Sequence, residues 1–353
     1  MTRSWKKSTS ILVAVLAILA FACGGCLSTS GANIWKSQVL PVQGRDLNSV
    51  WGSSSSGVFC VGIDGTIAHC DKTKWSTMSS GTEDNLTDVW GDRDADHALH
   101  AFAVGDTGTM LHSDGKSWQE MSSGTSENLK SIWGSSWDNA FAVGTDGVIV
   151  HYDGSMWSPM LSGTEETLSD VWGSSSDNVF AVGWGGTVLK YDGSSWTQMS
   201  SGTTSRLWAV WGSYSDNVFA VGNTGTILQY NGTDWAQMSS KVEDPLNSVW
   251  GSSSDDVYAV GANGTILHYN GNSWSTMTSK TKEHLNHVWG SSSDDVFAVG
   301  MEGTALHYPE KSGDYGLPLW AWILIGVFAP FVVYMMAPVL RPVLRVAVRI
   351  VRR

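Results

Sequence analysis

The chain has 353 residues, of which only 15% are charged, and it contains 39 Gly and 20 Trp. This composition is poor in the residues that solvate long helices and rich in turn formers and large packing residues, which favours an all-β chain. Apart from basic residues near its two ends, the chain carries 13 Lys and Arg against 33 Asp and Glu. The acidic central region should repel a nucleic acid backbone, so nucleic acid is excluded as a partner.

Residues 1–22 are predicted to be an export signal. A basic stretch is followed by an apolar run over Ile11–Ala22, with small residues at the cleavage site. This run is too short to span a bilayer as a helix. Cleavage is expected before Cys23. The thiol of Cys23 would be lipidated if the signal is of the bacterial lipoprotein type, although Ala20 stands where such signals usually carry Leu.

The central region is an internal repeat. A Val-Trp-Gly or Ile-Trp-Gly triplet recurs seven times, at spacings of 39, 43, 39, 39, 39 and 39 residues. Each unit, best seen from Leu168, has four short β-rich runs separated by turns such as Asp64-Gly65, whose residue types tolerate a positive φ. One four-stranded sheet cannot bury both of its faces, so the repeat predicts a closed seven-bladed β-propeller over residues 33–308. The triplet tryptophans are Trp51, Trp90, Trp133, Trp172, Trp211, Trp250 and Trp289.

The two ends of the repeat predict how the ring closes. The seventh unit stops at Tyr308 and lacks the outer strand that the other units build around a W-x-x-M sequence. In six units the tryptophan of that strand lies fifteen residues before the next triplet, and Trp35 lies sixteen residues before Trp51. We therefore predict that Asn33–Leu40 completes the last blade as its outer strand. Closure also explains the absence of the polar caps that an open solenoid needs.

Two stretches of the repeat carry a family resemblance. Val288–Gly300 (VWGSSSDDVFAVG) and Gly264–Trp274 (GTILHYNGNSW) resemble the propeller repeats of bacterial and archaeal surface proteins, known as BNR/Asp-box-like, YVTN-like or kelch-like repeats. The resemblance covers residues 33–308 and implies a propeller on the cell envelope, without naming its role, since these folds host many functions. The spacing between Asp192 and Trp196 differs from that of the Asp box in sialidase-type proteins.

The C-terminal region is predicted to anchor the protein. Residues 309–316 are a linker, and Leu317–Leu340 has no charged residue, as expected of a transmembrane helix. Five Arg follow in residues 341–353, and the positive-inside bias places this basic tail in the cytoplasm and the propeller outside. The tail acts as a topology signal or, alternatively, as a basic amphipathic helix on the inner leaflet.

The repeated His and Asp residues are interpreted as structural. His residues recur at one repeat position, where other blades carry Lys or Gln, and five Asp recur in the turn after the first strand. Such a turn Asp can bond to nearby backbone. No cofactor is predicted, and calcium is the one ion considered, although no D-x-D-x-D loop is present. The residues are His112, His151, His268 and His307, and Asp138, Asp177, Asp216, Asp255 and Asp294.

Cys60 and Cys70 are candidates for a disulfide in an exported domain. They lie on the paired second and third strands of the first blade. If Asp64-Gly65 is a two-residue turn, Cys60 opposes His69 and the two sulfurs point to opposite faces of the sheet. A bond then requires a bulge or a longer loop.

An enzymatic reading finds little support. A sialidase-like site needs three Arg around a carboxylate, and the propeller contains only Arg45, Arg93 and Arg206. With the usual strand order, Arg93 lies on the face opposite to the other two. No catalytic residue is therefore assigned.

The residues that break the repeat are better candidates for a binding site. Trp184 lies in the turn between the second and third strands of blade four, and Arg206 and Trp208 lead into the first strand of blade five. Both segments open onto one face of a propeller, so the three residues should be neighbours. Exposed Trp beside Arg is typical of a protein hot spot or a sugar platform. The alternative is that both Trp simply seal the blades. Trp137 and Tyr214 are expected on the opposite face of the propeller.

The sequence thus favours a membrane-anchored, extracytoplasmic propeller of a prokaryotic envelope, expected to be monomeric, that binds a protein or glycan partner as an interaction or scaffold module. The alternatives are a sialidase- or lyase-like enzyme acting on glycans and a factor that assembles envelope complexes. A flat, aromatic-rich face would favour binding, and a bound divalent ion or a cluster of invariant acids at the axis would favour catalysis.

Overall fold

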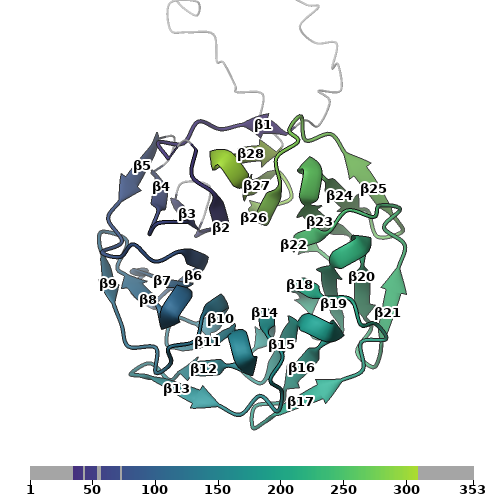
Figure 1. Ribbon diagram of the computed structural model, residues 1–353, viewed down its shortest axis with the longest axis horizontal. Coiled ribbons are helices and arrows are strands. Elements are labelled where there is room, and N and C mark those ends of the chain that lie inside the picture. The colour runs from purple at the N-terminus through teal and green to yellow at the C-terminus, as the bar shows by residue number, and fades with distance from the viewer. Residues whose placement is uncertain (1–34, 43, 54–56, 72–73, 309–353) are drawn as a thin grey trace, which may run out of the picture. The chain divides into compact units, whose positions relative to one another are not determined.

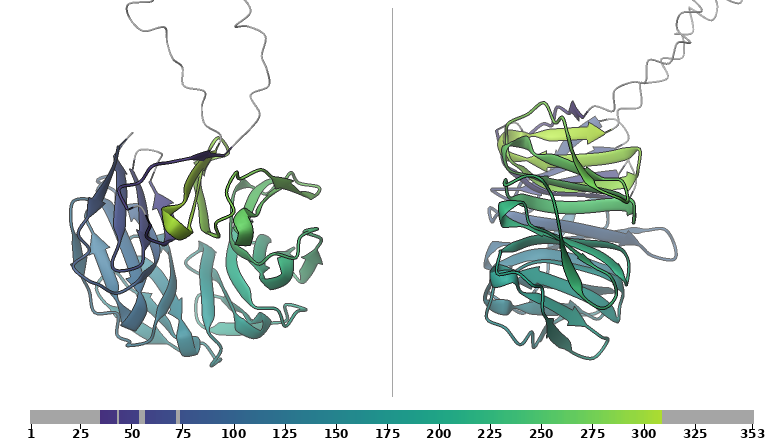
Figure 2. Two further views of the ribbon diagram at one scale, coloured as in Figure 1. Left: turned by 45° about the horizontal axis from the view of Figure 1, so that its top comes forward. Right: turned by 90° about the vertical axis from the view of Figure 1, so that its right-hand side faces the viewer.

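The computed structural model describes residues 35–308 except 43, 54–56 and 72–73. Seven four-stranded antiparallel sheets are arranged around a central axis, as the repeat predicted (Figure 1). Figure 2 shows the ring from the side, with the strands crossing its thickness. The described chain is therefore an all-β, seven-bladed propeller.

Each blade is built from strands that are consecutive in the sequence, except the last. Blade one comprises β2 (Leu47–Gly52), β3 (Gly57–Gly62), β4 (Ile67–Asp71) and β5 (Lys74–Met78). Blade two comprises β6 (Leu86–Arg93), β7 (Leu99–Gly105), β8 (Met110–Ser113) and β9 (Trp118–Glu120). Blade three comprises β10 (Leu129–Ser136), β11 (Asn139–Gly144), β12 (Ile149–Tyr152) and β13 (Trp157–Met160). Blade four comprises β14 (Leu168–Ser175), β15 (Asn178–Gly183), β16 (Val188–Tyr191) and β17 (Trp196–Met199).

The remaining blades follow the same pattern. Blade five comprises β18 (Leu207–Tyr214), β19 (Asn217–Gly222), β20 (Ile227–Tyr230) and β21 (Trp235–Met238). Blade six comprises β22 (Leu246–Ser253), β23 (Asp256–Gly261), β24 (Ile266–Tyr269) and β25 (Trp274–Met277). Blade seven comprises β26 (Leu285–Ser292), β27 (Asp295–Gly300), β28 (Ala305–Tyr308) and the N-terminal β1 (Lys36–Ser37).

The hydrophobic core lies between neighbouring blades. Alternate residues of a strand point to opposite faces of its sheet, so the apolar run of each second strand, Val-Phe-Ala-Val in blade four, supplies both adjoining interfaces. Phe180 and Val182 of blade four, for example, share one buried cluster with Leu207 and Val218 of blade five. A single blade would leave both of these faces in water, which explains why the sheets assemble as a ring.

The Trp-Gly pair of the repeat forms a second contact between blades. The Trp90 ring of blade two lies over Gly134 of blade three, where a Cβ would come within 2.5 Å of the ring. The same contact closes the circle, because Trp289 of blade seven lies over Gly52 of blade one at 2.9 Å from the corresponding position. Glycine is therefore required by close packing at this position.

The N-terminal segment closes the ring, as predicted. β1 pairs with β28, Lys36 opposite His307, and the backbone N–H of Gln38 donates to the Ala305 carbonyl at 2.8 Å. Trp35 is buried and stacks on Tyr308 with ring centroids 5.2 Å apart. Of the expected strand Asn33–Leu40, residues 33 and 34 lie outside the described residues. Within 35–40, Lys36 and Ser37 have strand geometry, so the pairing ends before Leu40.

The turns between second and third strands have the predicted positive φ but are longer than two residues. Asp146 has φ 53° and Gly147 has φ 67° within a single 3-10 turn, η3 (Thr145–Gly147). A Cβ on Gly147 would lie 2.0 Å from the carbonyl oxygen of Thr164, in the segment that leads to blade four. The turn can therefore lie directly against the next blade only with Gly at this position.

This longer turn corrects the expected cysteine geometry. Cys60 lies opposite Ala68 and Cys70 opposite Val58, so the two residues are diagonal neighbours that belong to the same buried cluster. Diagonal strand positions are typically about 7–8 Å apart, beyond the usual Cα separation of a disulfide. Both cysteines are accordingly buried thiols in the described structure rather than a disulfide.

Several sequence-based predictions lie outside the described residues. These are the export signal, the possible lipidation of Cys23, the linker, the transmembrane helix over 317–340 and the basic tail. Within the ranges that the structure does describe, none of the helices has the length and apolar character to cross a bilayer.

Candidate functional site

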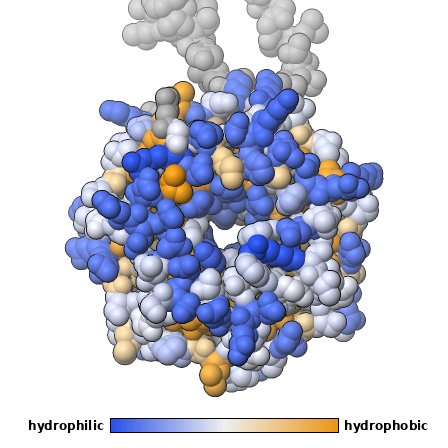
Figure 3. Space-filling view, in the orientation of Figure 1, coloured by the Kyte–Doolittle hydropathy of each residue, from blue (hydrophilic) through white to orange (hydrophobic). Residues whose placement is uncertain are grey.

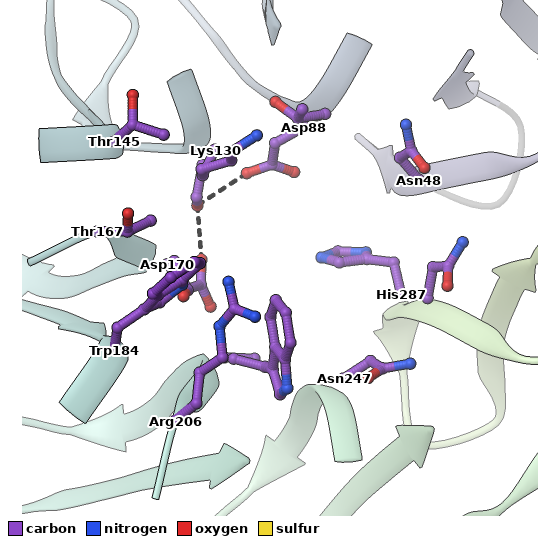
Figure 4. Close-up of a pocket in the computed structure, with 16 residues that line it drawn as sticks. Asn48, Asp88, Lys130, Thr145, Thr167, Asp170, Trp184, Arg206, Asn247 and His287 are labelled. Carbon is purple, nitrogen blue, oxygen red and sulfur yellow. Dashed lines mark hydrogen bonds between the residues drawn. The ribbon is translucent and has the colours of Figure 1, made fainter. Parts of the chain in front are cut away.

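The three residues predicted to form a binding site lie together. The guanidinium carbon of Arg206 is 3.6 Å from the ring centroid of Trp184 and 3.8 Å from that of Trp208. Arg206 is thus sandwiched between a tryptophan of blade four and a tryptophan of blade five (Figure 4). Two cation–π contacts of this kind fix the plane of the guanidinium.

Local backbone structure explains this placement. Trp184 begins η4 (Trp184–Gly186), and a Cβ on Gly186 would lie 2.1 Å from the Thr203 carbonyl oxygen, so η4 lies directly against the segment that leads into β18. The Arg206 carbonyl accepts a hydrogen bond from the Asn223 N–H at 2.9 Å, and the Trp208 indole N–H donates to the Asn223 side chain at 2.8 Å. Both the arginine and one of its flanking rings are held by blade five itself.

The arginine has hydrogen-bonding capacity that the described chain does not use. Its Nε is buried and has no hydrogen-bond partner among the described residues. Burial lowers the pKa of Arg206 from its ordinary value, because a desolvated cation loses hydration. Trp184 remains 41% exposed, so one side of the sandwich reaches solvent.

The sandwich forms one wall of a cavity at the axial mouth of the ring. The cavity has a volume of about 620 Å³, a size that suits a small ligand or a peptide side chain with its neighbours. The space-filling view shows this hollow at the centre of the face, surrounded mainly by hydrophilic residues (Figure 3). The lining residues are Asn48, Thr87, Asp88, Lys130, Ser131, Thr145, Thr167, Ser169, Asp170, Trp184, Arg206, Trp208, Ala209, Asn247, Asn286 and His287.

Polar residues of the first strands form two rings around the axis. The residue after the leading Leu supplies the upper ring, in which Asn48, Asn247 and Asn286 each donate from Nδ2 to the leading Leu carbonyl of the next blade. These bonds measure 2.8, 2.9 and 2.9 Å. Blades three, four and five carry Lys130, Ser169 and Trp208 at this position. The upper ring is called the asparagine belt after Asn48, Asn247 and Asn286. It is interrupted at the blades that carry the Arg–Trp sandwich.

The next residue of each first strand supplies the lower ring, which contains two carboxylates. Ser131 of blade three donates to Asp88 Oδ2 at 2.9 Å and approaches Asp170 Oδ1 at 2.5 Å. Each Asp also accepts a backbone N–H of the following blade, from Ile132 at 2.9 Å and from Val210 at 2.7 Å. The lower ring thus ties consecutive blades together at the axis.

One of these carboxylates, that of Asp170, differs in protonation behaviour from exposed aspartates. Burial, and secondarily the charge of Asp88, raise the pKa of Asp170 to about 7. Across the ring, His287 accepts the Val50 N–H at Nδ1, 3.3 Å away, and burial lowers the pKa of its imidazole. The axial floor of the cavity therefore presents hydrogen-bond acceptors, whereas its blade-five wall presents the cation of Arg206.

The other candidates from the sequence lie elsewhere. Arg45 donates to Thr66 at 3.1 Å within blade one, and Arg93, at the end of β6, donates to the His97 carbonyl at 2.8 Å, and neither lines the cavity. Tyr214 is 66% exposed at the end of β18 remote from Arg206, and Trp137 stacks on His100. The three arginines are not gathered around one site.

The repeated histidines make structural contacts. His268 pairs with Asp256 and His307 with Asp295, each at 2.7 Å, His151 contacts Asn139 at 3.4 Å, and His112 contacts His100 at 3.1 Å. Four of the five recurring turn aspartates, all but Asp216, accept a hydrogen bond from the serine two residues earlier, as Asp177 does from Ser175 at 2.6 Å. Among described side chains, no three or more His, Cys, Asp and Glu are grouped to hold a metal ion.

The axial residues were not among the candidates predicted from the sequence. One repeat position carries Asp88, Asp170 and His287 in three blades and Ser in three others. Lys130 interrupts the asparagine belt. An alignment of the seven L-x-x-V-W-G segments contains this signal. Its meaning depends on knowing that these positions face one another across the axis.

Comparison with known proteins identifies the fold. No family model and no curated protein matches the sequence. Among solved structures, the chain is similar to YCF48 from Cyanidioschyzon merolae (18% identity, TM-score 0.64, covering 78% of this chain and 98% of that chain) and to a structure described as YCF48 bound to D1 peptide (18%, 0.65, 78% and 97%). It is also similar to the WD40 propeller of Doa1 (11%, 0.67, 80% and 98%). At these identities the likeness establishes a β-propeller fold.

Proposed function

We propose that this protein is a membrane-anchored binding module that takes a segment of a partner protein into the axial cavity. One observation carries the proposal: Arg206, held between Trp184 and Trp208, lines a cavity of about 620 Å³ and has an unused donor. Trp and Arg in a partly desolvated pocket are the residues that dominate protein interfaces. All three are departures from the repeat, so the fold itself does not require them.

A protein partner is favoured over a glycan by the position of the guanidinium. A sugar platform needs a free aromatic face on which a sugar ring can stack. Here the guanidinium fills the space between the two indoles, at 3.6 and 3.8 Å from their centroids. The inner faces are therefore occupied, so a sugar ring has no room to stack between the two indoles.

The non-enzymatic role is supported by where the arginines lie. The sialidase-like alternative requires three Arg around one carboxylate, and Arg45 and Arg93 are bonded away from the cavity. The structure described as YCF48 bound to D1 peptide provides a precedent for a peptide ligand on a propeller of this kind. By analogy, the partner of this chain is a protein segment, and a role in assembling an envelope complex is one form that such binding takes.

The proposed location rests on sequence features. The predicted export signal, the apolar stretch over 317–340 and the Arg-rich tail together place the propeller outside the cytoplasmic membrane, held by its C-terminal helix. The resemblance of the repeat to those of prokaryotic surface propellers agrees with this topology. The cavity would then face partners in the envelope.

Site-specific photo-crosslinking in native membranes tests the proposal. A photoreactive phenylalanine replaces Thr167, which lines the cavity, or Tyr214, which is exposed at the other end of β18. We expect a discrete protein adduct from Thr167 only. The double variant Trp184→Ala/Trp208→Ala should abolish the adduct while the propeller stays folded. Adducts from Tyr214 alone, or an unchanged adduct in the folded double variant, would show that the cavity is not the binding site.

A further inference from the structure

We propose that the partner segment presents a single carboxylate, from an Asp or Glu side chain, to the edge of Arg206. This inference rests on the proposed function and adds the chemistry by which the partner is recognised. It follows from the geometry of the sandwich, from the other charges in the cavity and from the acceptors of the asparagine belt.

The sandwich leaves the arginine only one way to bind a ligand. Both faces of its guanidinium are covered by indole rings, so the in-plane N–H groups are the groups that remain for hydrogen bonding. A guanidinium held in a fixed plane presents two parallel donors that match the two oxygens of a carboxylate. The indole rings also fix the arginine before binding, which reduces the entropy lost when the ligand arrives.

The described chain supplies no counter-ion for this cation. Arg206 makes no ion pair with any described carboxylate, and its Nε lacks a partner although it is buried. A cation taken partly out of water without a counter-ion is costly unless a ligand later supplies the charge. An external anion would supply the missing counter-charge for Arg206.

The neighbouring charges limit the ligand to one negative charge. Asp88 and Asp170 line the same cavity, and Lys130, the other basic residue of the lining, is paired with Asp106 at 3.7 Å. A phosphate or a polyanion would therefore meet one available cation and two carboxylates. A carboxylate carries one charge spread over two oxygens, and that charge is matched by Arg206 alone.

The rest of the cavity suits the backbone of a peptide. Asn48, Asn247 and Asn286 use their Nδ2 groups to bind carbonyls of the next blade, which leaves each Oδ1 as an acceptor in the lining. Figure 4 shows Asn48 on the side of the cavity across from the sandwich. Amide N–H groups next to an acidic residue could donate to these oxygens, so an acidic peptide satisfies both sides of the cavity.

Arginine-selective NMR of the full chain in detergent micelles tests the inference. The probes are the peptides Ac-Gly-Glu-Gly-NH2 and Ac-Gly-Gln-Gly-NH2, which differ only in the carboxylate. The Nε–H signal of Arg206 is assigned as the one that Arg206→Lys removes. We expect the glutamate peptide to shift this signal in a saturable, salt-sensitive way and the glutamine peptide to leave it in place.

Matched variants measure the contribution of the charge. Affinity for the glutamate peptide is measured for each variant by its effect on indole N–H signals. Arg206→Gln should weaken binding roughly 10- to 100-fold, as expected for the loss of charge-assisted hydrogen bonds. Arg206→Lys keeps the charge but loses the planar pair of donors, so it should lie between Arg206→Gln and the parent. Arg45→Gln removes a positive charge from blade one, away from the cavity, and should bind like the parent.

The outcomes separate this inference from the proposed function. Equal responses to the two peptides, or no response of Arg206 to either, would overturn the inference. If the crosslinked partner requires the two tryptophans but binds Arg206→Gln as tightly as the parent, the proposed function stands and the carboxylate assignment is wrong. Near-ultraviolet circular dichroism of each variant establishes that the propeller is folded.

Discussion

Replacement of Trp35 by Ala tests how the ring is held closed. The Trp35 side chain is 1% exposed, stacks on Tyr308 at 5.2 Å and meets the Tyr258 ring edge-on at 6.2 Å. Truncating a buried Trp to Ala typically costs about 3–5 kcal/mol, because apolar contacts are lost and a cavity remains. At about 2–4 °C per kcal/mol for a domain approaching this size, the melting temperature should fall by roughly 6–20 °C.

The measurement is thermal unfolding followed by near-ultraviolet circular dichroism, with limited proteolysis as a second readout. Trp196→Ala is the matched control, since Trp196 has the equivalent position in blade four but belongs to a strand that is continuous with its own blade. Both variants should lose similar stability, but only Trp35→Ala should make blade seven the first site of cleavage. A fall of less than about 3 °C for Trp35→Ala would refute the closure argument, and deletion of residues 33–40 should then also be tolerated.

Three further predictions concern the turns, the axis and the cysteines. Gly147→Ala should be less stable than Gly163→Ala by about 1–3 kcal/mol in denaturant unfolding, because both have a positive φ but only a Cβ at Gly147 meets a carbonyl oxygen, 2.0 Å away. The folded pKa of Asp170, about 7, lies above its ordinary value, so its contribution to stability is full below about pH 4 and is lost as the pH rises through 7. Unfolding measured between pH 4 and 8 should show this loss in the parent, and an equal slope in Asp170→Asn would contradict it. Burial raises the pKa of Cys60 and of Cys70, so iodoacetamide should alkylate both slowly in the native protein and rapidly after unfolding. Peptide-resolved mass spectrometry measures the two rates. Rapid labelling of the native protein would disprove the burial of these thiols.

The ring itself could be predicted because the four-strand sequence pattern occurs seven times in the chain. The incomplete seventh unit and the displaced Trp35 also predicted closure, since both concern the presence of a strand. The cysteine register was harder to predict, because Asp64 and Gly65 have positive φ in the longer turn that Thr66 closes on Ile63, as they would in a two-residue turn. Residue types that permit a backbone conformation do not determine the length of the loop that contains it.

The binding site was predictable only in part, for a related reason. Trp184, Arg206 and Trp208 are evident as large departures within two segments that any propeller brings to one face. The axial network depends on small differences between blades: Ser131 matters because Asp88 and Asp170, 43 residues before it and 39 after it, both bond to it. Such a contact follows from the closed geometry of the ring and has no local sequence signature.

The strand pairing that closes the ring also determines how it should respond to force. Lys36 lies opposite His307 in an antiparallel pair, so Trp35 and Tyr308 leave the pair at the same end. Tension applied between these two residues would load the hydrogen bonds one after another, as in opening a zipper, rather than all at once in shear. The contact that completes the propeller should therefore be the first to rupture when its ends are pulled apart, even though Trp35 is among its most deeply buried side chains.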